Sequence, residues 1–149
     1  MKNITKICIC LLIICLFMGT VCATDINNLK VPDGWKAIGG GSYHQEGISP
    51  GSGNGQNMMI QKYHDSLKDE YYQNISSEQY FVIDKGNDTY MFTDGYNEDS
   101  GSFEVVEIDG QKYFVLFTTV DDLNVEEVAK TYMFMMEFNQ LNNLEPIAV

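Results

Sequence analysis

Arginine is absent from the sequence, and all nine basic residues are lysines. The chain therefore lacks the side chain that grips phosphates and carboxylates through two parallel hydrogen bonds. Cysteine is confined to the N-terminal segment, at Cys8, Cys10, Cys15 and Cys22. If that segment is removed, disulfides, thiolate-bound zinc and a cysteine nucleophile are all excluded.

Positive charge is also scarce, because 21 Asp and Glu residues give the chain a formal net charge of −12 at pH 7. Every acidic residue follows residue 23, whereas Lys2 and Lys6 precede it. Nucleic-acid binding needs a cationic face that releases counterions from phosphates, and anionic membranes attract the same kind of face. We therefore expect no nucleic-acid partner and no anionic membrane surface as partner, and the charge favours cations or basic partners.

The N-terminal segment has the three parts of a secretory signal. Lys2 and Lys6 are followed by an apolar run over residues 7–18, and Val21 and Ala23 stand at the −3 and −1 positions of a cleavage site. This pattern predicts a signal peptide over residues 1–23 and export of the remaining chain. The uncharged stretch over residues 7–24 approaches the length of a membrane span, so an uncleaved anchor is the alternative. Both interpretations predict a secreted or cell-surface protein.

Residues 24–30 are polar and are interpreted as a short tether, and residues 31–149 have the length of a single domain. The hydrophobic alternation and the turn residues indicate strands at residues 35–38, 42–45, 57–63, 80–84, 89–93, 103–108 and 112–120. Helical patterns cover residues 65–73 and 125–140. This order predicts an α+β fold, an antiparallel β-sheet with a long C-terminal α-helix packed on one face.

Four short runs carry a resemblance to a known group of proteins. They are VPDGW at 31–35, GGSY at 40–43, VEIDGQKY at 106–113 and EFNQLNNL at 137–144. In these runs the chain resembles small secreted proteins of methanogenic archaea, and in outline it is similar to PsbP-like domains. The resemblance implies an exported α+β fold, and it implies no active site, because that group has no assigned function.

No catalytic residue is assigned from the sequence. The two histidines, His44 and His64, lie 20 residues apart, and a triad built on Ser42 and His44 has no nucleophile-elbow pattern to support it. Glu104 and Glu107 are interpreted as neighbouring acids at a strand edge. A small extracellular hydrolase acting on wall or peptide substrates is the alternative function, and it requires a deep pocket that holds a histidine near a carboxylate.

Calcium is the metal that the sequence favours, because it takes six to eight oxygen ligands from flexible acidic loops. One glycine-containing loop offers four such side chains, Asp94, Asn97, Glu98 and Asp99. A second turn, residues 84–88, lies nearby in the sequence. Neither has the spacing of an EF-hand, and solvated turns are the other interpretation. A calcium-stabilised surface domain therefore stays among the alternatives.

Two Asn-x-Ser/Thr triplets begin at Asn74 and Asn87, which makes both asparagines candidate glycosylation sites in an exported protein.

The C-terminal helix is predicted to be apolar on two sides. The core-facing stripe is expected to contain Val125, Val128, Ala129, Tyr132, Met135 and Met136. A second stripe of Phe134, Phe138 and Leu141 would lie opposite, covered by the tether or the 144–149 tail, or forming a surface for a partner or a second copy. We therefore expect an acidic, non-enzymatic binding module with a protein or cell-wall partner, and the oligomeric state stays open.

Overall fold

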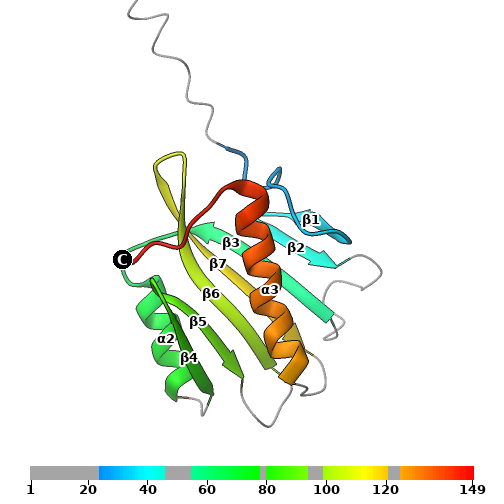
Figure 1. Ribbon diagram of the computed structural model, residues 1–149. Helices are drawn as coiled ribbons and strands as arrows, with labels where there is room; N and C mark the ends of the chain where they lie inside the picture. Colours follow the sequence, from blue (N-terminus) through cyan, green and yellow to red (C-terminus); the bar gives the residue numbers. More distant parts are fainter. Residues whose placement is uncertain (1–23, 46–54, 78–79, 94–98, 121–124) are drawn as a thin grey trace, which may run out of the picture.

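The computed structural model describes residues 24–45, 55–77, 80–93, 99–120 and 125–149. They form one seven-stranded antiparallel sheet in the order β1-β2-β3-β7-β6-β5-β4, together with two helices (Figure 1). The elements are β1 (Trp35–Gly39), β2 (Ser42–Gln45), β3 (Gly55–Lys62), α2 (Leu67–Ser77), β4 (Phe81–Gly86), β5 (Thr89–Thr93), β6 (Asp99–Ile108), β7 (Gln111–Val120) and α3 (Val125–Asn142). The predicted α+β class with an antiparallel sheet is confirmed.

The β6–β7 hairpin forms the centre of the sheet. Its turn residues, Asp109 and Gly110, both have positive φ angles of 51° and 76°, as the commonest two-residue hairpin turn requires. Side chains then alternate between the two faces along β7, so that Phe114 is buried on one side and Val115 on the other. Both faces of the central strands are therefore covered.

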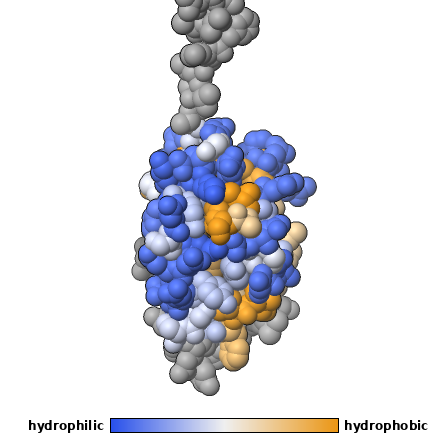
Figure 2. Space-filling model, turned by 90° about the vertical axis from the view of Figure 1, so that its left-hand side faces the viewer, coloured by the Kyte–Doolittle hydropathy of each residue, from blue (hydrophilic) through white to orange (hydrophobic). Residues whose placement is uncertain are grey.

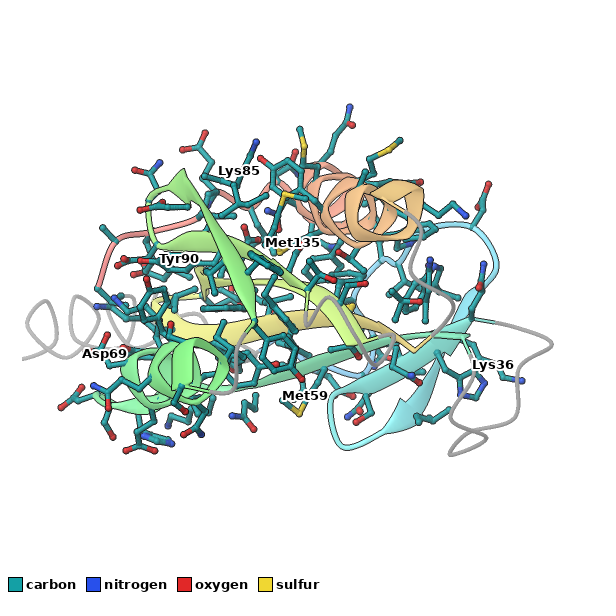
Figure 3. The ribbon with its side chains drawn as sticks, turned by 90° about the horizontal axis from the view of Figure 1, so that it is seen from below. Lys36, Met59, Asp69, Lys85, Tyr90 and Met135 are labelled. Atoms are coloured by element: carbon teal, nitrogen blue, oxygen red, sulfur yellow. The ribbon has the colours of Figure 1, made fainter. Side chains whose placement is uncertain are left out.

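The two faces of the sheet have separate hydrophobic clusters. On the α3 side, Met135 and Phe138 of the helix pack with Val115 and Phe117 of β7 and with Trp35 of β1. The view in Figure 3 shows α3 on one side of the sheet, with Met135 and Lys85 on the same side, and α2 with Asp69 on the other. The helix itself lies over β5, β6 and β7, and the α3-side cluster extends from it to side chains of β1, β2 and β3.

Aromatic rings dominate the α2 side. Tyr71 of α2 has its ring centroid 5.0 Å from that of Phe103 and 5.4 Å from that of Phe114, in edge-on and tilted orientations. Tyr90 of β5 stacks on Phe103 at 5.1 Å. Such ring pairs add to the hydrophobic gain from burial, and they fix α2 against the β5–β7 half of the sheet.

The segment after α3 returns to β6 as an extended chain. The Ile147 amide donates to the Val105 carbonyl at 2.8 Å, and Pro146 forms a bridge with Val106. Ile147 packs in the α2-side cluster, although α3 itself packs on the other face. The 144–149 segment therefore contacts both hydrophobic clusters.

The N-terminal part of the described chain is also packed. Ile26 and Leu29 contact the α3-side cluster, and the Tyr43 hydroxyl donates to the Ile26 carbonyl. Asn142, at the end of α3, holds the last residue of this segment. Its side chain accepts from the Lys30 amide at 3.0 Å and donates to the Lys30 carbonyl at 2.7 Å. Residues 24–30 therefore cover one end of the core.

Neither described helix has the length and hydrophobicity needed to cross a bilayer. Residues 1–23, on which the signal-peptide and anchor predictions depend, lie outside the described residues.

Gly41, in the β1–β2 turn, allows the sharpest test of this packing. Its φ is +77°, and a Cβ at this position would lie 2.1 Å from the Ile60 carbonyl oxygen. Gly41→Ala should therefore destabilise the protein by about 2 kcal/mol or more in chemical denaturation, through backbone strain and the clash together. Gly40→Ala is the matched control, because Gly40 also has a positive φ but has no atom within 4 Å of that position. Equal losses in the two variants would contradict the close approach to β3.

Candidate functional site

A cavity of about 350 Å³ lies between α3 and the β4–β5 hairpin, within the size range of small-ligand pockets. The 144–149 segment contributes Pro146 to its wall. The residues that matter for its chemistry come from β4, β5, β6 and α3: Lys85, Thr89, Glu104, Tyr132, Met136 and Asn139.

Glu104 is the buried acid of this cavity. Strand alternation on β6 places it on the same face as Val106 and Ile108, and the residue is only 1 % exposed. One carboxyl oxygen accepts from the Asn139 amide at 2.5 Å and the other from the Thr89 hydroxyl at 3.3 Å. Burial raises the pKa of Glu104 to about 7, and the two hydrogen bonds offset only part of that rise. The group therefore changes its charge near neutral pH.

Asn139 brings a second buried polar group to the cavity. It is 9 % exposed, and its Nδ2 is used by Glu104. Its Oδ1 is buried without a hydrogen-bond partner in the described part of the chain. Leaving a buried acceptor unsatisfied costs about 1–3 kcal/mol, so a donor that reached this oxygen past the cavity-lining part of Asn139 would gain a hydrogen bond.

Tyr132 and Lys85 meet at the rim. The Lys85 ammonium lies 5.0 Å from the centre of the Tyr132 ring, within the range of a cation–π contact. Lys85 is exposed and comes from the last part of β4, and Tyr132 is half-buried on α3. The aromatic wall of the cavity therefore already holds one cation, supplied by the protein itself.

The β4 side of the molecule has a largely hydrophilic surface, with hydrophobic residues showing near the middle of this face and again toward its lower end (Figure 2). On β4 itself Phe81 and Ile83 are exposed, with relative exposures of 66 % and 53 %. The cavity lies toward the other end of this strand, where Lys85 and Gly86 line it. It is thus separate from the exposed hydrophobic residues of β4.

The structure corrects the predicted faces of α3. Phe138 was predicted to lie with Phe134 and Leu141 in a second stripe, covered by the tether or the tail or forming a partner surface. It is fully buried in the α3-side cluster, and its ring lies 6.1 Å from that of Phe117. Phe134 and Leu141 are half-buried at the flank, and Phe134 packs edge-on against Trp35 at 5.3 Å. Met136, predicted to face the core, is 54 % exposed instead.

A buried polar pair explains why the buried face of α3 differs from the predicted one. Thr131 of α3 is buried and forms a hydrogen bond of 2.9 Å with Ser102 of β6. The polar residues of β6 that face α3 need polar partners, and Thr131 and Asn139 supply them. The buried face of α3 is therefore partly polar, and an apolar stripe alone does not locate it.

The histidines do not belong to the cavity. His44 is buried in β2 with a relative exposure of 3 %, and His64 is exposed beyond the end of β3. Since His44 pairs with Asn57, the seven residues from Asn57 to His64 separate the two side chains by roughly 20 Å along the strand. The predicted pocket that combines a histidine with a carboxylate is therefore not the cavity at Glu104.

The predicted calcium residues Asp94, Asn97 and Glu98 lie outside the described residues, and Asp99 is described only in its backbone. In the second predicted turn, the Asp88 carboxylate is already engaged by the Lys68 ammonium at 2.9 Å and by the Val149 amide at 2.8 Å. Within the described residues, no three His, Cys, Asp or Glu side chains gather around a common point.

The two candidate glycosylation residues are both exposed. Asn74 lies on α2, and Asn87 lies in the β4–β5 turn with a φ of 51°. Asn87 also lines the cavity, which places that triplet beside the candidate site.

Sequence reasoning missed Glu104, although a signal was present. Glu104, Val106 and Ile108 follow one another at every second position, so a strand that buries the two apolar residues also buries the carboxylate. Asn139 gave no comparable signal, because a single amide in a helix is ordinarily solvated.

No protein-family description matches the chain, and neither a curated protein nor a solved structure is significantly similar to it. The resemblance to PsbP-like domains and to secreted archaeal proteins stays a prediction, and the cavity at Glu104 has to be interpreted from its own geometry.

Proposed function

We propose that the chain is an exported, acidic, non-enzymatic binding module, and that its ligand site is the cavity between α3 and the β4–β5 hairpin. One observation carries the proposal. Two polar side chains that are more than nine-tenths buried, Glu104 and Asn139, meet in a cavity of ligand size, and one acceptor atom there is unsatisfied. Burying such groups destabilises a fold, so their presence is better explained by binding than by stability.

The surroundings support binding of a small molecule. The polar groups are held by a β-strand and a helix, so their positions are fixed before a ligand arrives. Tyr132 and Met136 add an apolar wall to the same space. A few fixed polar atoms within a partly apolar cavity are the usual composition of a small-ligand site.

Obstruction of the cavity provides the test. Met136 lines its mouth and is exposed, so Met136→Trp should fill the opening while leaving the core intact. The experiment screens small polar probes (n-butylammonium, n-butanol, glycerol, glucose and acetate) at millimolar concentration by amide NMR. At least one should shift the signals of Thr89, Glu104 and Asn139, and Met136→Trp should abolish these shifts.

Met133→Trp is the matched control, because Met133 is 65 % exposed on the same helix and does not line this cavity. It should leave probe binding unchanged. If no probe class perturbs the cavity signals, or if both tryptophan variants have the same effect, the cavity is not the binding site.

The pKa of Glu104 favours one second candidate, a hydrolase that uses this residue as a general acid. An acid with a pKa near 7 suits proton transfer at neutral pH. Glycoside hydrolysis needs a second carboxylate across the cleft, and Glu104 is the one carboxylate among the described lining residues. Release of nitrophenol from a nitrophenyl glycoside by the protein, lost in Glu104→Gln, would establish this alternative.

A further inference from the structure

We infer that the cavity binds the ammonium group of a small organic amine, held between the Glu104 carboxylate and the free Asn139 Oδ1, with the Tyr132 ring at the rim. This inference rests on the proposed function and names the ligand class for the same site. Three features of the described residues support it independently, namely hydrogen-bond polarity, charge, and an existing cation contact.

The first feature is that the groups at this end of the cavity offer hydrogen-bond acceptors to a ligand. The Asn139 Nδ2 and the Thr89 hydroxyl already donate to Glu104, so the donors nearest the acid are used. What remains is acceptor capacity, on the carboxylate oxygens and on the unpartnered Asn139 Oδ1. A ligand that satisfies this end of the cavity must therefore be a hydrogen-bond donor, and an ammonium has three donors and no acceptor.

Charge narrows the class from donors to cations. A carboxylate that is 1 % exposed is stable as an anion only when a positive charge offsets its lost hydration. Within the cavity the charged and titratable groups near Glu104 are Lys85 and Tyr132 at the rim, and its direct contacts, Thr89 and Asn139, are neutral. The formal net charge of −12 further attracts cations toward the site.

The cation–π contact shows that the aromatic wall accepts an ammonium. Lys85 places its own ammonium 5.0 Å from the centre of the Tyr132 ring. Because Lys85 is exposed on a hairpin end, its side chain can leave this ring for solvent at small cost. A bound amine would take over the ring face, and Lys85 would weaken its binding by repulsion between like charges.

The experiment is a calorimetric titration with n-butylammonium chloride at pH 8 and pH 5.5, with n-butanol as the uncharged analogue and NaCl at equal ionic strength. Alkylamines titrate near the lysine value of about 10.4, so the probe stays charged at both pH values. If only the ionised acid binds, a pKa of about 7 predicts an affinity about thirtyfold weaker at pH 5.5 than at pH 8.

Two variants should act in opposite directions. Glu104→Gln keeps the size of the side chain and should weaken binding at least about tenfold at pH 8 and remove the pH dependence. Lys85→Met removes the competing ammonium and should tighten binding several-fold. A mere loss of structure cannot produce the gain with Lys85→Met.

The outcomes separate this inference from the proposed function. Saturable binding of n-butylammonium with both variant effects supports the ammonium site. If n-butanol or glycerol perturbs the cavity signals and n-butylammonium does not, the ligand class is wrong and the binding site stands. If none of the probes binds, the inference and the proposed function both fail.

Discussion

Phe138→Ala should destabilise the protein by about 3–5 kcal/mol, the loss that is typical when a buried phenylalanine is truncated and a cavity remains. The Phe138 side chain is 0 % exposed and packs with Met135, Phe117 and Trp35 in the α3-side cluster. A partner-binding phenylalanine on an exposed stripe would give a far smaller loss in the isolated protein, because surface substitutions change stability by about 0.5 kcal/mol or less.

Met133→Ala is the matched control on the same helix, since Met133 is 65 % exposed. Urea denaturation of the two variants and the parent protein measures the difference. Losses that are small and similar in both variants would show that α3 does not bury Phe138, and the predicted surface stripe would then stand.

Glu104→Gln should stabilise the protein by about 3 kcal/mol at pH 8 and have little effect near pH 4, as follows from an acid whose pKa moves from 4.5 to about 7 on folding. Between these two pKa values the folded state keeps a proton that the unfolded state releases. The stability of the parent protein therefore falls as pH rises through this window and levels off above about pH 7. Glutamine does not ionise, and its carbonyl oxygen can still accept from Asn139.

The measurement is the free energy of unfolding as a function of pH, from pH 4 to pH 8, for the parent and the variant. Glu107→Gln is the control, because Glu107 is exposed on the same strand and points to the other face. Curves for parent and Glu104→Gln that stay parallel across this range would contradict the raised pKa of Glu104. A bound amine should reduce the difference in unfolding free energy between the parent protein and Glu104→Gln at pH 8, because it offsets the buried charge of Glu104.

The strands of this fold were predictable because two local signals agreed. Residues 103–108 and 112–120 are rich in β-branched and aromatic residues on either side of Asp109-Gly110, and the structure places this turn between β6 and β7. The turn of the β4–β5 hairpin was predictable from the same kind of signal, since Asn87 and Asp88 are residues that tolerate positive φ angles and both adopt them. Local chemistry of this kind needs no knowledge of the tertiary contacts.

The orientation of α3 was not predictable for a physical reason. The sequence offers apolar residues around most of the helix, and both flanks are consistent with burial. The choice depends on Ser102 and Glu104, which lie on another element and bond to Thr131 and Asn139 of the helix. A pairing of buried polar groups between distant segments leaves no periodic pattern in either segment.

The candidate site was hidden from the sequence for the same reason. Its parts come from β4, β5, β6 and α3, and the chemistry arises from one carboxylate and one amide that are unremarkable alone. Composition leads to the same expectation as the proposed ammonium site, since the scarcity of positive charge favours cations as ligands.

The extended 144–149 segment has a consequence for solubility. β5 pairs with β6 only as far as Phe103, so the amides and carbonyls of β6 beyond that residue have no neighbouring strand on that side. Pro146 and Ile147 occupy this open margin opposite Val105 and Val106. An exposed margin of a long apolar strand is a template for pairing with another chain, and proline there donates no amide. Pro146 and Ile147 thus cover part of this margin without forming a strand, which leaves less of it available for pairing with a second copy.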